Sequence, residues 1–134
     1  MRESSERGAV AIEFAILLPI LLFLFLGIIE FGRAYNAQIT LSQGARESVR
    51  VMAIADDNVA ARSAATRSSG LLDPTLMTID ITAQDPRDPS GTVIVDDCRP
   101  EHDVTVQIEY DLASITGFFN AYKIRGIGTM RCGG

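Results

Sequence analysis

An apolar run near the N-terminus constrains this chain more than any other feature. Residues 9–29 read AVAIEFAILLPILLFLFLGII, and 18 of these 21 residues are apolar, the exceptions being Glu13, Pro19 and Gly27. A helix of this length spans roughly 31 Å, about the thickness of the hydrocarbon core of a bilayer. A chain of 134 residues leaves too little structure to enclose so uniformly apolar a helix. The run therefore predicts a transmembrane helix rather than a buried core helix.

Removal of this segment as a secretory signal is the main alternative. A signal peptide has an apolar region of about 7–15 residues that ends at small residues such as A-x-A. Here the run is longer and no such site follows it before the helical pattern resumes. Arg2 and Arg7 precede the run, and basic flanks favour the cytoplasmic side of a membrane. We therefore expect a cytoplasmic N-terminus, with the rest of the chain on the outer side.

Glu13 is the one charged residue inside the apolar run. A carboxylate within a membrane helix costs about 2.5–3.5 kcal/mol on insertion scales, so it needs a partner or a nearby interface. One explanation, which stays open, is that the Glu13 side chain reaches back to the cytoplasmic interface. Glu13 does not stand alone, however. Gly8 lies five residues before it, directly after the short charged leader MRESSER, and Phe14 follows it.

The string GAVAIEF at residues 8–14 resembles the processing site of type IV prepilins of the Flp, or tight-adherence, branch. Residues 8–50 resemble the TadE-like pseudopilin family more broadly. The residues that carry this resemblance are Glu13-Phe14, Pro19, Gly27, Glu30-Phe31-Gly32-Arg33 and Ala45-Arg46-Glu47. The likeness is weaker around Gly128-Thr129-Met130-Arg131, and the chain departs from the family pattern at Ser48-Val49 and at Cys132.

This resemblance implies a minor pseudopilin, with a structural role rather than an enzymatic one, in the assembly of a tight-adherence pilus. A membrane prepilin peptidase would cleave after Gly8 and leave Ala9 as the new N-terminus. Gly8 has no side chain, so the backbone there would enter a narrow active site in an extended form. Glu13, next to Phe14, would then act in assembly and register by meeting the N-terminal amine of a neighbouring subunit.

The implied partners are the prepilin peptidase, other pilin or pseudopilin subunits, the inner-membrane assembly platform and membrane lipid. A different class of function stays open beside this one: an uncleaved, membrane-tethered extracellular module for binding or adhesion. The two hypotheses differ at Gly8 and Glu13, because only a pilin requires cleavage after Gly8 and subunit packing through Glu13. Neither reading involves a cofactor.

Three regions are expected along the chain: a prepilin leader at 1–8, a transmembrane or assembly helix at 9–29 and an extracytoplasmic head at 30–134. Pro19 lies within the second region, where it removes a helical hydrogen bond and predicts a kink or local melting. Beyond residue 29, a helical spacing of apolar residues continues to Ala53. The expected packing face includes Phe31, Ala34, Tyr35, Gln38, Leu41, Ala45, Val49, Met52 and Ala53.

The rest of the head is expected to have an α+β fold that is pilin-like, with a small antiparallel sheet following the long helix. A break and helix N-cap are predicted at Asp56-Asp57-Asn58, and a short helix over 59–69 is predicted to end before Gly70. Alternating patterns predict strands over 77–83, 92–95, 104–110 and 121–132.

Cys98 and Cys132 are the only cysteines, and both follow the predicted membrane helix. An even number of cysteines in an oxidising compartment favours a disulfide, which would tie the last strand to the start of the third. Two free thiols are the alternative. A metal pair formed with His102 lacks further ligands of suitable spacing, so no metal site is expected there.

The composition excludes several other functions. The net charge of −5 provides no basic footprint for nucleic acid. Ten acidic and two basic residues lie between Asp73 and Asp111, which predicts a solvated acidic surface. Calcium binding through Asp80, Asp85 and Asp88, or through Asp96 and Asp97, is a weaker alternative because no EF-hand spacing occurs. The sequence also contains no nucleophile-elbow, phosphate-loop or zinc-protease motif, so no catalytic residue is expected.

Overall fold

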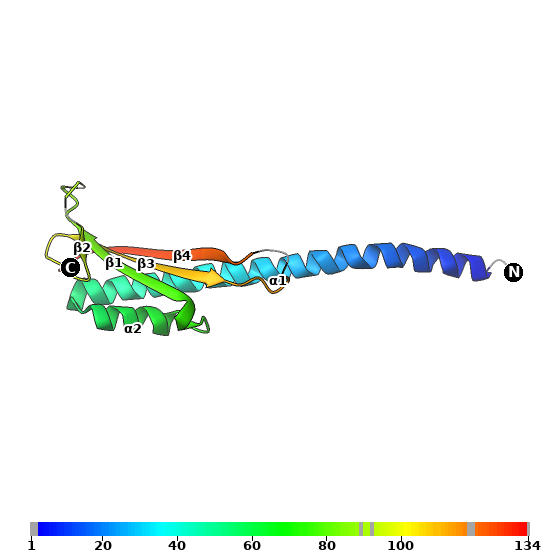
Figure 1. The fold of residues 1–134 in the computed structure, drawn as a ribbon, viewed down its shortest axis with the longest axis horizontal. Coiled ribbons are helices and arrows are strands. Elements are labelled where there is room, and N and C mark those ends of the chain that lie inside the picture. The colour runs from blue at the N-terminus through cyan, green and yellow to red at the C-terminus, as the bar shows by residue number, and fades with distance from the viewer. Residues whose placement is uncertain (1–2, 89, 92, 118–119, 134) are drawn as a thin grey trace.

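The first helix, α1 (Glu3–Ala55), is 53 residues long and forms the axis of the molecule. The structure, a computed structural model, describes residues 3–88, 90–91, 93–117 and 120–133. Figure 1 shows that the N-terminal half of α1 projects as a bare rod, whereas its C-terminal half lies within a small head. The long N-terminal helix and the antiparallel sheet confirm the predicted α+β fold.

The head consists of one further helix and a sheet that lie along the C-terminal half of α1. Its sheet is antiparallel, and the strands lie in the order β2 (Ile94–Val95), β1 (Met77–Gln84), β3 (Asp103–Leu112) and β4 (Tyr122–Arg131). Three strands are long, and β2 contributes only two residues at one edge. The elements after α1 are α2 (Asn58–Ser68), the 3-10 helix η1 (Pro74–Leu76), β1 (Met77–Gln84), β2 (Ile94–Val95), β3 (Asp103–Leu112) and β4 (Tyr122–Arg131).

Most of the predicted boundaries agree with these elements to within two residues. Asp57 is the N-cap of α2, where its carboxylate accepts hydrogen bonds from the backbone N–H groups of Val59 and Ala60. Gly70 follows the C-cap Ser69 with a φ of 62°, a conformation that glycine adopts without strain. The second strand is shorter than predicted, because it covers Ile94–Val95 rather than residues 92–95. Thr92 lies outside the described residues.

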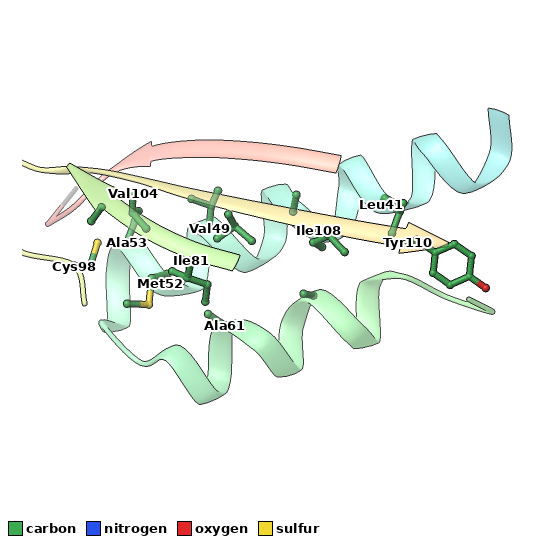
Figure 2. Packing of buried hydrophobic residues seen from close by; sticks show 14 of the residues in the cluster. Leu41, Val49, Met52, Ala53, Ala61, Ile81, Cys98, Val104, Ile108 and Tyr110 are labelled. Atoms are coloured by element: carbon green, nitrogen blue, oxygen red, sulfur yellow. The ribbon is translucent and has the colours of Figure 1, made fainter. Parts of the chain in front are cut away.

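The core lies between α1, α2 and one face of the sheet (Figure 2). Alternate residues of β3 are buried, as expected for a strand with one face on a core. Leu41, Met52 and Ile81 are among the largest fully buried side chains. Ser48 is the polar exception on this face of α1, and its hydroxyl donates to the Ala61 carbonyl at 2.8 Å, which satisfies the group between the two helices.

The packing face of α1 begins later than the sequence pattern predicts. Leu41, Ala45, Val49, Met52 and Ala53 are buried, as expected. Phe31 and Tyr35, however, are 73% and 61% exposed, and their rings stack on each other with centroids 6.3 Å apart. The helical spacing of apolar residues does not show at which residue the head stops covering α1. The first buried residue of this face beyond Glu30 is Ala37, so the expectation for Phe31 and Tyr35 is wrong.

Candidate functional site

The candidate functional site is the bare half of α1. Every residue from Gly8 to Ile29 is exposed, although the segment is almost entirely apolar. Its large side chains, such as Phe14 and Phe25, are 61% and 57% exposed. Within the described residues, one helix is long and apolar enough to cross a membrane, and it contains this segment. This exposure contradicts the alternative of a buried core helix, because none of the described residues of the head covers the segment.

Gly8 and Ala9 lie in regular α-helix and are exposed. A Cβ added at Gly8 would meet no atom within 4 Å. A protease that requires an extended backbone would have to unwind this end of the helix. Glycine makes such unwinding easier, because it is among the weakest helix formers.

Glu13 lies four residues after Ala9, and residues four apart share one face of a helix. At 1.5 Å per residue the two lie roughly 6 Å apart along the axis. The Glu13 side chain is exposed, and no cation of the described residues lies within 4 Å of it. Phe14 lies in the same bare segment and is also exposed. A single chain therefore offers Glu13 no internal partner among the described residues.

α1 remains α-helical through Pro19. The structure shows no melted turn at this position, and the kink expected from the missing hydrogen bond stays a prediction. The residues around Pro19, including Leu18 and Ile20, are exposed, so a bend would meet no packed neighbour.

Glu30 lies at the junction between the bare helix and the head. The sequence pattern predicts no role for it, although it is one of the residues that carry the family resemblance. The side chain is 6% exposed, and Oε2 accepts a hydrogen bond from the Ile115 backbone N–H at 3.2 Å. Arg33, one turn later, donates to the Ala113 carbonyl at 3.3 Å and lies 4.0 Å from the same Glu30 oxygen. The two side chains hold the loop after β3 against α1. The sequence signal for these two contacts is an acidic residue directly after an apolar run, with an arginine three residues later.

The Glu30 carboxylate is only half satisfied by this contact. Its Oε1 atom is buried, and no donor among the described residues reaches it. Glu30 also lines a mostly apolar groove of about 660 Å³, whose other walls come from Gly27, Phe31, Ala34, Asn120, Ala121 and Tyr122. The groove therefore lies at the point where the apolar segment of α1 ends.

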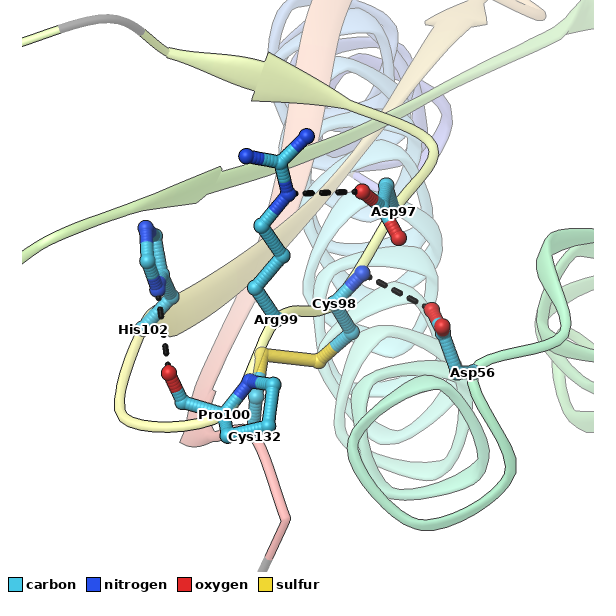
Figure 3. Close-up of a disulfide and its surroundings, with 7 residues drawn as sticks. All are labelled: Asp56, Asp97, Cys98, Arg99, Pro100, His102 and Cys132. Atoms are coloured by element: carbon cyan, nitrogen blue, oxygen red, sulfur yellow. Dashed lines mark hydrogen bonds and ion pairs between the residues drawn. A yellow bond between two sulfur atoms is a disulfide. The ribbon is translucent and has the colours of Figure 1, made fainter.

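Cys98 and Cys132 form a disulfide at the far end of the head (Figure 3). Both residues are buried, and Cys132 follows directly on β4. The Cys98 backbone N–H donates to Asp56 Oδ1 at 2.8 Å, just beyond the end of α1. The Gly133 N–H donates to the Ala53 carbonyl at 3.1 Å. The disulfide thus joins the end of β4 to the segment between β2 and β3, and the two hydrogen bonds hold these segments at the end of α1.

The acidic residues considered for calcium are largely engaged with other groups. Asp96 pairs with Arg62 at 2.8 Å and Asp97 with Arg99 at 3.2 Å. Asp85 accepts a hydrogen bond from the Arg87 backbone N–H. In the part of the chain that the structure describes, no group of three or more His, Cys, Asp or Glu side chains is placed to hold a metal ion.

Two acidic side chains of the head have lowered pKa values. Hydrogen bonding to Arg50, reinforced by its positive charge, holds the pKa of Glu47 below its ordinary value. Hydrogen bonds from the Thr75 side chain and backbone lower the pKa of Asp73, which caps the short helix η1. Both groups lie outside the apolar segment, and neither belongs to the candidate site.

Residues 8–50 match the family model described as TadE-like protein. The resemblance to the TadE-like family is confirmed over this segment. The match begins at Gly8, includes the whole bare segment of α1 and ends within the part that packs in the head. A search of curated proteins and a search of solved structures found no match. TadE-like pilins are a structural family, so the match suggests a role related to the tight-adherence pilus.

Proposed function

We propose that this protein is a minor pseudopilin of a tight-adherence (Flp, type IVb) pilus. In this proposal a prepilin peptidase removes residues 1–8, and residues 9–29 first span the membrane and then pack against other subunits. The head of residues 30–134 lies on the outer side of the cytoplasmic membrane. The observation that carries the proposal is the uniform exposure of an apolar half-helix that begins at a prepilin-like site and matches a TadE-like family.

The arrangement of the helix supports this function physically. A helix with apolar side chains all around its circumference is soluble only in lipid or in a bundle of similar helices. Both environments occur along the proposed path, since the subunit would leave the bilayer and enter a fibre. The platform of the assembly machinery and the neighbouring pilins would contact this same segment.

Glu13 would set the axial register of such a bundle. Cleavage after Gly8 creates an ammonium group on Ala9, and a neighbouring subunit presents its Glu13 at a similar depth. Within a bundle of apolar helices the pair would be weakly screened. Removing one partner would leave the other charge buried and unpaired, at a cost of about 3–5 kcal/mol.

The disulfide supports the proposed orientation of the head. Disulfides persist in oxidising compartments and are rare in the cytoplasm. Cys98 and Cys132 both lie in the head, far from the N-terminus. The basic leader residues favour a cytoplasmic N-terminus, so both arguments give the same topology.

The mass of the mature chain tests the processing step. We expect an N-terminus at Ala9 in membranes from the native host. Gly8→Val should leave the precursor intact, because its side chain obstructs the scissile backbone. Gly27→Val is the matched control, since both glycines are exposed on α1 with open space around them. An intact wild-type chain, or a cut beyond Ile29, would contradict the proposal.

Substitution of Glu13 tests the packing step. Glu13→Gln should abolish pilus assembly while membrane insertion and head folding persist, because it removes the charge and little else. Glu47→Gln is the control, an acid on the same helix that pairs locally with Arg50. Normal piliation with Glu13→Gln would refute the register role. A full-length chain that adheres to surfaces without pili would instead favour the membrane-tethered adhesion module.

A further inference from the structure

We propose that the head makes a second contact with the membrane: the loop after β3 lies in the outer lipid interface beside α1. This inference rests on the proposed membrane span of residues 9–29. Residues 113–117, all of them described, form the first part of this loop, and Ile115 is the large exposed apolar side chain among them. The occupant of this surface is the phospholipid interface itself.

The depth of the loop follows from one hydrogen bond. Ile115 donates its backbone N–H to Glu30, and Glu30 is the first residue after the apolar run. One helical residue rises about 1.5 Å, so the loop lies at the end of the hydrocarbon-spanning segment. The headgroup region extends roughly 5–8 Å beyond the hydrocarbon core on each side. A loop tied to Glu30 is therefore within this region.

The composition of the loop fits this depth. Ile115 is 60% exposed, although the loop is held in place through its backbone. The Ile115 backbone N–H donates to Glu30, and the Ala113 carbonyl accepts from Arg33. Because both backbone groups have hydrogen-bond partners on α1, the free-energy cost of moving the loop out of water is lower. An exposed isoleucine on such a loop gains free energy when it enters the apolar edge of the interface.

The neighbouring residues of α1 show the pattern of a membrane interface. Phe31 and Tyr35 are stacked and exposed just beyond the apolar run, and aromatic residues are enriched at this level of membrane helices. The mostly apolar groove next to Glu30 opens at the same height, with Gly27 on the bare helix and Tyr122 at the start of β4. Lipid chains that surround the bare helix would meet this groove directly.

Tryptophan fluorescence offers a clean test, because the chain contains no tryptophan. Ile115→Trp is the probe, and the full-length protein is placed in vesicles of phosphatidylcholine with brominated acyl chains. Ile54→Trp is the matched control, since Ile54 and Ile115 are 61% and 60% exposed. Ile54 lies 24 residues beyond Glu30 on the same helix, roughly 36 Å further from the membrane.

We expect Ile115→Trp to emit at shorter wavelength and to lose most of its emission to bromines placed near the headgroups. Ile54→Trp should show neither effect. Unquenched emission from Ile115→Trp would overturn the inference. A blue shift without lipid quenching would also overturn it, because a second protein chain would then cover the loop.

Leu22→Trp, in the middle of the bare segment, separates this inference from the proposed function. Quenching of Leu22→Trp together with an unquenched Ile115→Trp would contradict the loop contact alone. If Leu22→Trp also stayed unquenched, the membrane span itself would be contradicted. The intact disulfide, measured by thiol labelling, confirms in each variant that the head is folded.

Discussion

Gly126 lies against the backbone of Leu41, where β4 runs alongside α1. A Cβ added to Gly126 would lie 2.3 Å from the Leu41 carbonyl oxygen and 2.4 Å from its carbonyl carbon. Gly128 is similarly placed against Ala45, at 2.7 Å from the carbonyl oxygen. These two glycines allow the strand and the helix to approach without intervening side chains. The head is thereby held directly on the helix that carries the candidate site.

Gly126→Ala should destabilise the head by about 3 kcal/mol or more, because neither backbone is able to move without breaking the sheet or the helix. The melting temperature of the full chain in detergent should fall by more than about 10 °C. Gly32→Ala is the control, since a Cβ there meets nothing within 4 Å. That change should be neutral or slightly stabilising, by about 0.5–1 kcal/mol, because alanine favours a helix. An unchanged melting temperature for Gly126→Ala would exclude the close approach.

Glu30→Ala should loosen the loop after β3, because the Ile115 N–H loses its acceptor. A loss of about 1 kcal/mol would raise the exchange rate of the Ile115 amide proton roughly fivefold. Glu30→Gln keeps an oxygen acceptor, so most of the protection should remain. Equal exchange rates in the two variants and the wild type would show that Glu30 does not hold the loop. Amide hydrogen exchange with site resolution makes this measurement.

Reduction of the Cys98–Cys132 disulfide should destabilise the head substantially. The two cysteines are 34 residues apart, and a closed loop of this size contributes about 3–4 kcal/mol in the chain-entropy model. The variant with both cysteines changed to serine should melt well below the wild type under oxidising conditions. Under reducing conditions the wild type should approach the variant. A variant as stable as the oxidised protein would contradict this account.

Arg50→Gln should raise the pKa of Glu47 towards its ordinary value of 4.5, because Arg50 is the main cause of the lowering. A depressed folded-state pKa means that the ion pair favours folding above the ordinary pKa. This contribution is lost as the pH falls through the lowered value. Titration of the Glu47 carboxyl by NMR makes the measurement. Arg46→Gln is the control on the same helix, and an equal shift there would point to general charge rather than the hydrogen bond.

Much of the fold was predictable because its signals are local. The apolar run predicts the bare helix, and the acidic break at residues 56–58 predicts the turn into α2 through the capping chemistry of Asp57. Alternation of polar and apolar residues predicts β1 and β3, because successive side chains of a strand face opposite sides. Helix η1 was missed, since its signal is a single Asp73 cap before a proline.

The candidate site was predictable only in part. The motif around Gly8 and Glu13 is read directly from neighbouring residues. The role of Glu30 was not, because its partner Ile115 lies 85 residues away in the sequence. The same holds for Gly126 and Gly128, whose importance depends on β4 lying directly against α1.

The hydrophobic pattern shows that one segment must avoid water, and the helical and alternating patterns after it indicate a small α+β head. Hydrophobicity and periodicity are properties of each segment alone, so they are interpretable without knowledge of the fold. The point at which the head stops covering α1 is visible only in the folded chain. That limit depends on strand lengths, on the register between β3 and β4, and on the contact of Glu30 with Ile115. The same limit exposes Phe31 and Tyr35 and leaves the apolar N-terminal half of the helix uncovered by the described residues of the head.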